Sequence, residues 1–411
     1  MEAGDVAWVS VATGLVMLMT PALGFFYAGL VRKKNLVSIL AQCMAIFAVV
    51  SLVWTFWGYS LSFGTSVNGV IGDLSLFDLN NIGPTTTARY APNIPELLYF
   101  AFELMFAAIT PALIIGAFAE RIKFSSLLVF TVLWSTLIYS PIAHWVWNTG
   151  GWLHSLGAID FAGGVVVHVA AGLSALAAAL VVGRRKDFDK RHEFKPSNVP
   201  YVLLGAALLW FGWFGFNGGS AFAANEWAVS AIVATSLSAA AAMVSWMIVE
   251  WITKGKPSAV GMAIGSVCGL AAITPGSGYV SVPAAIFIGF IAGVISNLIS
   301  NWRIARTRLD DTLDVFACHG VGGILGMIAT GLFASINIKL NGDIGLGLFY
   351  GNHNPSLLIS QLIAVVVVAA FAFFGSYALL RLIKIFSPLR VSQEEEEMGL
   401  DLSQHGEEAY S

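Results

Sequence analysis

Residues 6–34 read VAWVSVATGLVMLMTPALGFFYAGLVRKK, an apolar stretch that carries no charge until Arg32, Lys33 and Lys34 close it. A helix rises about 1.5 Å per residue, so the uncharged part is long enough to cross a hydrocarbon core about 30 Å thick. Basic residues commonly mark the end of such a crossing at the membrane surface. The stretch therefore predicts a transmembrane helix, and the recurrence of this pattern decides the fold.

The composition of the whole chain also indicates a protein that lies in a lipid bilayer. Hydrophobic residues make up 57% of the chain and charged residues 11%, and the mean hydropathy is +0.78. A soluble domain usually carries about 25% charged residues, so this chain has too little polar surface to fold in water. The net charge of −3 offers no basic surface for nucleic acid. We predict a multi-pass protein of the cell membrane, and since Met1–Val6 holds no basic residue we expect no cleavable signal peptide.

Apolar runs that end at charges, Pro or Gly recur along the whole chain and predict eleven spans. The predicted spans are Val6–Leu30, Leu36–Phe63, Glu96–Phe118, Phe124–Trp147, Ile159–Val182, Val199–Asn217, Asn225–Trp251, Ala259–Ile273, Val280–Trp302, Thr312–Ser335 and Ser356–Phe386. We therefore predict an all-α membrane protein, with a transmembrane domain over residues 1–390 and a polar tail over residues 391–411.

The basic residues test this count of spans. All but two of the 21 Lys and Arg residues fall in loops that follow odd-numbered spans or at the end of the eleventh span. The two exceptions are Arg89 and Lys339. Because basic residues accumulate on the cytoplasmic side, this distribution predicts an N-terminus outside the cell and a cytoplasmic tail. A missed or an extra span would scramble the distribution.

Eleven spans divide naturally into five, five and one. A five-span unit that repeats must have inverted topology, because its two copies enter the membrane from opposite sides. The fifth span carries Asp160 and His168, and the tenth carries Asp314 and His319. This correspondence supports the hypothesis of a five-plus-five inverted repeat.

Two histidines fall within apolar spans. The rise of a helix places His168 and His319 near the middle of the hydrocarbon core. Ionisable groups at that depth cost free energy and often mark a transport pathway. A neutral imidazole has one N–H donor and one acceptor nitrogen, so two rings in contact could pass a proton or bind a small polar solute. The alternative is two unrelated histidines, each hydrogen-bonded to a backbone carbonyl.

Facing histidines could also ligate haem. The chain has no CxxCH motif, and its other histidines lie at span ends, in loops or in the tail. We therefore expect no haem and no other cofactor or metal. The three cysteines stand in apolar stretches without a CxxC motif and are expected to be small buried residues.

Aromatic residues gather toward the predicted outer ends of the spans. Phe102 and Phe106 are spaced i, i+4 and share one helix face. Trp147 ends the fourth span, and Phe216 and Ser220 end the sixth. These residues fit an interfacial aromatic belt. They also fit a trap for a small cation with N–H donors, because ring faces attract ammonium-type cations and a hydroxyl accepts an N–H.

Five motifs carry a resemblance to a known family. They are Gly24–Arg32 (GFFYAGLVR), Gly116–Arg121 (GAFAER), Asp160–His168 (DFAGGVVVH), Gly212–Asn217 (GWFGFN) and Asp314–Gly320 (DVFACHG). In this order they resemble the ammonium transporter (Amt/Mep/Rh) family, the microbial Amt branch more than the Rh branch. The resemblance runs from about Gly4 to Ser411.

The resemblance implies a homotrimer of eleven-helix protomers, each with its own apolar pore, which serves nitrogen metabolism and is not an enzyme. The family's site residues map onto an outer ammonium site (Phe106, Trp147, Ser220), a gate (Phe106, Phe216), twin pore histidines (His168, His319), further pore residues (Phe26, Thr274) and a structural aspartate (Asp160). The implied function is transport of ammonium and methylammonium, with deprotonation at the outer site and conduction of ammonia. An ammonium sensor with little flux is the alternative.

Two further features follow from the resemblance. Glu103 stands where many relatives of the family carry glutamine. Because it neighbours Phe102, we expect it to face away from Phe106, toward the outer rim or a subunit contact. The alternative is that its charge attracts cations. The tail segment Gly399–Glu407 resembles the family's regulatory C-terminus, where PII-type signalling proteins dock. We expect it to lie on loops of a neighbouring protomer, and we expect the acidic run before it, Glu394–Glu397, to be a solvated linker.

Overall fold

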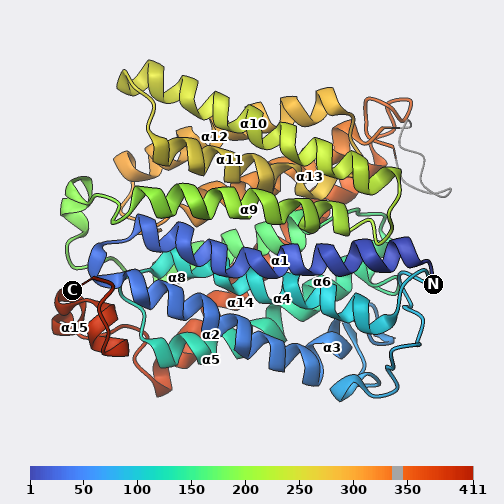
Figure 1. Ribbon diagram of the computed structural model, residues 1–411, viewed down its shortest axis with the longest axis horizontal. Helices are drawn as coiled ribbons and strands as arrows, with labels where there is room; N and C mark the ends of the chain where they lie inside the picture. Colours follow the sequence, from blue (N-terminus) through green and yellow to red (C-terminus); the bar gives the residue numbers. More distant parts are fainter. Residues whose placement is uncertain (336–345, 411) are drawn as a thin grey trace.

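The computed structural model of the protein describes residues 1–335 and 346–410, so Lys339 lies outside the described residues. In these ranges eleven helices are long and apolar enough to cross a membrane. They lie side by side and share one general direction (Figure 1). The predicted all-α membrane fold with eleven spans is confirmed.

The predicted spans differ from the observed helices mainly at their ends. The spans are built from α1 (Ala3–Leu30), α2 and α3 (Leu36–Val53 and Tyr59–Phe63), α4 (Glu96–Phe118), α5 and α6 (Phe124–Trp134 and Ser140–Trp147), α8 (Ala170–Val182), α9 (Val199–Gly219), α10 (Glu226–Lys254), α11 (Ala259–Ile273), α12 (Val282–Arg306), α13 (Val321–Phe333) and α14 (Ser356–Phe386). Short elements lie outside them: the strand pair β1 (Ser66–Val67) and β2 (Ile71–Gly72), α7 (Trp152–Ser155) and, in the tail, α15 (Gln393–Met398).

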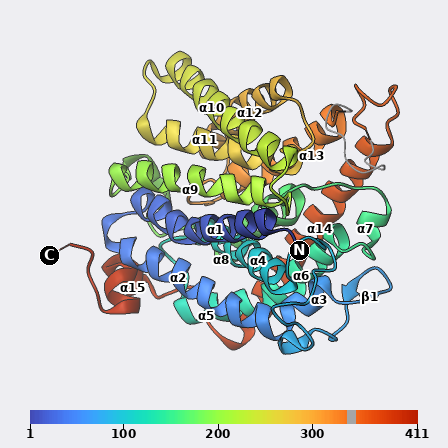
Figure 2. The same cartoon turned by 45° about the vertical axis from the view of Figure 1, so that its right-hand side comes forward.

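The helices α1 and α9 pack along one another (Figures 1 and 2). Small residues allow this close approach. A Cβ atom on Gly205 would lie 2.4 Å from the backbone nitrogen of Phe26, so only glycine fits there. Elsewhere on the bundle large apolar side chains point outward, such as Ile252 and Phe386, which are about four-fifths exposed in the single chain. An outward apolar surface of this kind suits lipid.

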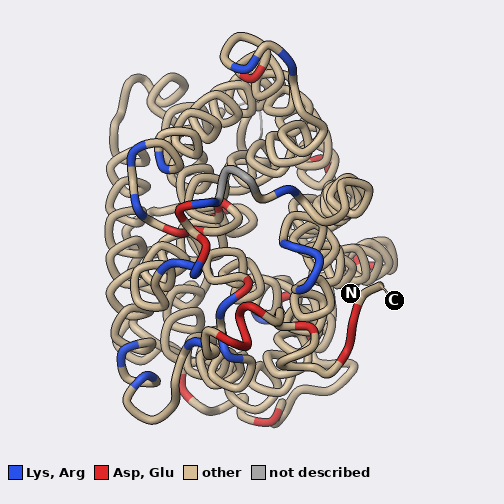
Figure 3. The backbone as a smooth tube through the Cα atoms, turned by 90° about the vertical axis from the view of Figure 1, so that its left-hand side faces the viewer, with Lys and Arg blue, Asp and Glu red and all other residues tan. Residues whose placement is uncertain are grey.

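The two chain ends lie at opposite ends of the bundle (Figure 1). We call the end that holds Met1 the N-face and the end that holds the tail the tail face. Acidic and basic residues crowd the loops of the tail face (Figure 3). The predicted orientation, with the tail face in the cytoplasm, stays a prediction.

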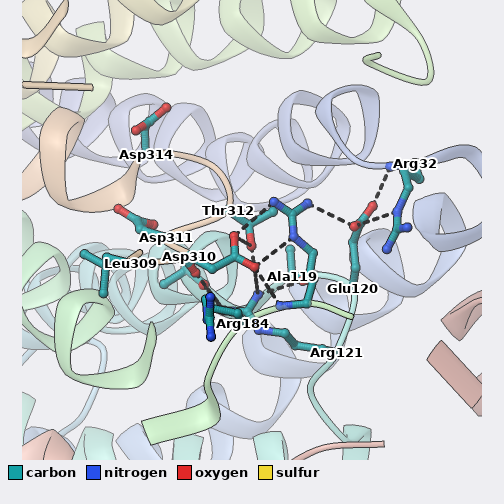
Figure 4. A network of polar contacts seen from close by, with 12 residues as sticks. Arg32, Ala119, Glu120, Arg121, Arg184, Leu309, Asp310, Asp311, Thr312 and Asp314 are labelled. Carbon is teal, nitrogen blue, oxygen red and sulfur yellow. Dashed lines mark hydrogen bonds and ion pairs between the residues drawn. The ribbon is translucent and has the colours of Figure 1, made fainter. Parts of the chain in front are cut away.

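A buried network of charges ties the loops of the tail face together (Figure 4). Glu120 forms ion pairs with Arg32 at 2.9 Å and with Arg185 at 3.1 Å, and Arg185 also pairs with Asp310 at 3.0 Å. Burial alone would raise the pKa of Glu120, but the two guanidinium groups hold that pKa below its usual value. Arg121 is fully buried and donates to four backbone carbonyls and to one hydroxyl. Every charge in this group is therefore paired or hydrogen-bonded, as burial requires.

The tail folds back onto loops of its own chain. Glu396 accepts from Arg390 Nε at 3.1 Å and from the backbone nitrogen of Lys186 at 2.7 Å, and its side chain is buried. Asp401 accepts from the backbone nitrogen of Ser38 at 2.7 Å. The prediction of a solvated acidic run is wrong for Glu396, because the run forms α15 and the helix turns this one side chain toward the basic loops.

Candidate functional site

Each of the two predicted pore histidines lies in a π-helical turn that an aspartate caps. The first turn spans Gly164–Val169 and includes His168. The carboxylate of Asp160 accepts hydrogen bonds from the backbone N–H groups of residues 163–166 at 2.6–3.1 Å. Gly163 has a φ of 109°, a left-handed conformation that glycine adopts without strain and that starts the turn. Asp160 therefore fixes the position of the turn that carries His168.

The second turn spans Phe316–Gly320 and includes His319. Asp311 caps it, accepting from the backbone nitrogens of Val315 at 3.2 Å and Phe316 at 2.8 Å. The predicted correspondence of Asp160 with Asp314 is wrong, because Asp314 forms an ion pair with Arg303 at 2.7 Å instead. Asp314 lies nearer to His319 in sequence, but only Asp311 reaches the start of the turn.

The two histidine rings contact one another. Their Nδ1 atoms lie 3.3 Å apart, and their ring centroids are 5.2 Å apart with an angle of 25° between the planes. Both side chains are buried. Their helices meet backbone to backbone, since a Cβ atom on Gly172 would lie 2.2 Å from the backbone nitrogen of Gly320. If both rings are neutral, the Nδ1–H of one ring donates to the Nδ1 of the other. The Nε2 atom of His168 has no hydrogen-bond partner among the described residues.

A column of aromatic rings connects the histidines with the N-face. Phe216 lies 6.0 Å from the ring of His168 and 4.2 Å from the ring of Phe106, measured between centroids. Trp147 meets Phe106 edge to face at 6.0 Å. The rings come from four different elements, and only the tertiary fold stacks them. The column therefore lies between the N-face and the histidines.

A cavity of about 660 Å³ opens above this column at the N-face, and we call it the N-face cavity. Phe106, Trp147, Ser220 and Asp160 contribute to its lining. Trp147 Nε1 donates to the backbone oxygen of Asp160 at 2.9 Å, which fixes the indole. Ser220 Oγ donates to the backbone oxygen of Phe216 at 2.8 Å, so its lone pairs are left to accept a hydrogen bond.

A much smaller cavity, of about 10 Å³, lies beside the histidines. This volume is close to the minimum that holds one water-sized molecule. Apart from His168 and His319, its lining residues are apolar or aromatic: Met19, Leu23, Ile109, Leu113, Val167, Leu209, Trp213, Phe216 and Val267. Such a lining suits a small neutral solute and disfavours a hydrated cation.

Two predicted pore residues line neither cavity. Thr274 is buried and accepts a hydrogen bond from Trp213 Nε1 at 3.0 Å. The ring of Trp213 stacks on His168 at 5.5 Å, so Thr274 holds the indole that contacts the histidine. Phe26 is buried next to Tyr27, with ring centroids 5.9 Å apart.

The sequence analysis did not predict that Trp213 contacts His168, and its prediction for the direction of Glu103 is wrong. Trp213 stands three residues before Phe216 on α9, so the i, i+3 spacing could have shown that both rings share a face. Glu103 stands three residues before Phe106 on α4, and by the same rule it turns toward the N-face cavity rather than away from it. Its side chain is 4% exposed in the single chain, which contradicts a position at the rim or at a subunit contact.

The described residues offer no larger set of metal ligands around the two histidines. Within residues 1–335 and 346–410, no three His, Cys, Asp or Glu side chains form a group that could hold a metal ion. All three cysteines are buried free thiols.

Comparisons with known proteins show the family to which the chain belongs. The model of the Ammonium Transporter Family matches residues 7–410. The chain is 47% identical over 411 residues to "Ammonium transporter Amt1" of Archaeoglobus fulgidus, covering 100% of both chains. It is 43% identical over 414 residues to "Ammonium transporter" of Bacillus subtilis, covering 100% of this chain and 99% of the relative.

Solved structures of related proteins have the same fold. The crystal structure of Candida albicans Mep2 matches with a TM-score of 0.90 and 37% identity, covering 100% of this chain and 91% of that chain. A structure named "Sensor Amt Protein" matches with a TM-score of 0.87 and 31% identity, covering 98% of both chains.

Proposed function

We propose a path by which this membrane protein moves its substrate, starting from the fact that the chain belongs to the Ammonium Transporter Family. Membership of the family supports ammonium transport across the cell membrane and places the protein outside the enzymes. Our proposal covers the direction of transport, the deprotonation of ammonium and the pore. The observation that carries it is the continuous order of N-face cavity, aromatic column, small apolar cavity and histidine pair.

The N-face lies outside the cell in this proposal, and the N-face cavity is the entrance. Ammonium or methylammonium binds between Trp147, Phe106 and Ser220. Ring faces attract the cation by roughly 0.5–2 kcal/mol each, and the hydroxyl of Ser220 accepts an N–H. Sodium and potassium need a cage of oxygen ligands, which rings cannot provide.

The cation loses a proton at the gate formed by Phe106 and Phe216. A cation in the small apolar cavity beyond the gate would lose its hydration without gaining paired charges, which costs several kcal/mol. Ammonia is neutral and close to water in size, so it suits that cavity. The centroids of the two rings lie 4.2 Å apart, which leaves no room for ammonia between them, so the rings must move for the gate to open.

Beyond the gate ammonia passes along His168 and His319. The hydrogen bond between their Nδ1 atoms connects two proton-exchanging groups near mid-membrane. We propose that the proton released at the gate follows this pair, so that transport is electrogenic. Asp160 and Thr274 hold the path in place through backbone and indole contacts, and Phe26 lines its inner half.

The assembly and the tail complete the proposal. Three protomers, each with its own pore, form a homotrimer through contacts among their spans. Residues 1–390 form the transport domain and residues 391–411 a cytoplasmic regulatory tail. The tail lies on the tail-face loops through Glu396 and Asp401, where a PII-type protein can act on it.

The deciding experiment is an ammonium jump on proteoliposomes adsorbed to a solid-supported membrane. We expect a transient current that saturates with ammonium, a smaller one with methylammonium, and none from protein-free vesicles. Uptake of ammonia without current would overturn the electrogenic step. Folded protein with neither current nor uptake would favour the ammonium sensor.

A further inference from the structure

Glu103 brings a carboxyl group to the N-face cavity, and the path above does not use this group. It stands one helical turn before Phe106 on α4 and lines the cavity together with Phe106 and Trp147. The exposed fraction of Glu103 is 4%, so the residue is 96% buried. Among the described residues, its Oε2 atom has no hydrogen-bond partner.

The other carboxylates of the cavity are already committed to backbone or amide donors. Asp160 accepts four backbone N–H groups. Asp5 accepts from Asn93 Nδ2 at 2.8 Å and from the backbone nitrogen of Ala224 at 2.7 Å. Glu103 is therefore the cavity carboxylate that keeps an oxygen free in the part of the chain that the structure describes.

Arg89 lines the same cavity as Glu103 but forms no ion pair with it. The electrostatic neighbours of Glu103 include the phenols of Tyr59 and Tyr99, which carry no positive charge. None of the ion pairs formed by the described residues includes Glu103. A buried carboxylate without a partner is unfavourable, and a cation that enters the cavity and donates an N–H relieves both the charge and the missing hydrogen bond.

We propose that Glu103 is a specificity-determining residue of the ammonium site, where its carboxylate accepts an N–H from the bound cation. This inference rests on the proposed function, since it assumes that the N-face cavity is where ammonium binds. Rings and one hydroxyl attract the cation weakly, and Glu103 adds a charge-assisted hydrogen bond on the α4 side. The substrate class is a small ammonium-type cation with at least one free N–H.

The test is the Glu103→Gln variant, which keeps the shape of the side chain and removes the charge. Losing one charge-assisted hydrogen bond should raise the ammonium concentration for half-maximal current about tenfold. Glu226→Gln is the matched control: it removes the same charge from an exposed position at the start of α10 and should leave half-saturation unchanged. Trp147→Leu, measured alongside, tests the cavity itself.

The outcomes separate the two proposals. A wild-type half-saturation in Glu103→Gln, with a shifted one in Trp147→Leu, would overturn the role of Glu103 and leave the site intact. No shift in either variant would overturn the N-face site as well. If Glu103→Gln does not fold, infrared difference spectra of the wild type decide: ammonium should shift a carboxylate stretching band and potassium should not, and an unchanged spectrum would refute the inference.

Discussion

Asp160 and Asp311 occupy equivalent places in the two halves of the molecule. Asp160 precedes His168 by the same number of residues as Asp311 precedes His319, and each carboxylate accepts backbone N–H groups at the start of the π-helical turn that carries the histidine. The helix α8, which continues the first turn, meets the second turn where Gly172 contacts Gly320. This correspondence supports the five-plus-five inverted repeat better than the pair Asp160 and Asp314 did.

The first prediction concerns the pH dependence of stability. Burial raises the pKa of Asp311 from 3.8 to about 6, and Asp311 lies in a loop between two spans. The folded protein therefore binds this proton more tightly than the unfolded chain, so stability falls by about 3 kcal/mol as pH rises from about 4 to about 6.

Asp311→Asn should flatten the unfolding temperature between pH 4 and pH 6, measured on purified protein in detergent. Asp78→Asn is the control, since this loop residue is exposed and has a positive φ that asparagine tolerates. A variant that keeps the full wild-type slope would show that another group causes it.

The second prediction concerns the histidine pair. Replacing His168 and His319 together by alanine should abolish ammonium-driven current while the protein still elutes as a folded trimer, because the only proton-exchanging groups of the small cavity are removed. The exposed His353→Ala is the matched control. Current at the wild-type level in the double variant would refute the proton relay.

The third prediction concerns the indole at the N-face cavity. Trp147→Leu removes one cation–π partner worth about 0.5–2 kcal/mol. Half-saturation of ammonium transport in proteoliposomes should therefore rise by up to roughly tenfold. An unchanged half-saturation, with the variant folded, would speak against a cation site at this position.

The fourth prediction concerns the tail. Truncation after Val391 removes Glu396 and Asp401, which hold the tail on the loops. We expect lower flux and no pull-down of the host's PII-type protein, with the trimer intact because its contacts lie among the spans. Glu396→Gln, with the exposed Glu394→Gln as control, should reproduce part of the loss of flux. Full flux together with retained PII binding after truncation would return the tail to a passive end.

The charge pattern and the hydropathy predicted the span count because both are local properties. An apolar run such as Ser356–Phe386 crosses a membrane whatever its neighbours are, so eleven spans and an all-α fold follow from the chain alone. The spacing of Phe102 and Phe106 is also local, and their rings lie 5.0 Å apart as one helix face requires.

The sequence by itself thus determined that the protein lies in a membrane, the number of its spans and the candidate residues of the site. Tertiary structure decided which of these residues meet. It placed His168 3.3 Å from His319 and brought the rings of Phe106 and Phe216 together, with their centroids 4.2 Å apart. The physical reason is that these outcomes depend on contacts between helices far apart in the chain, and hydropathy sums over single segments carry no information about which faces of two helices meet.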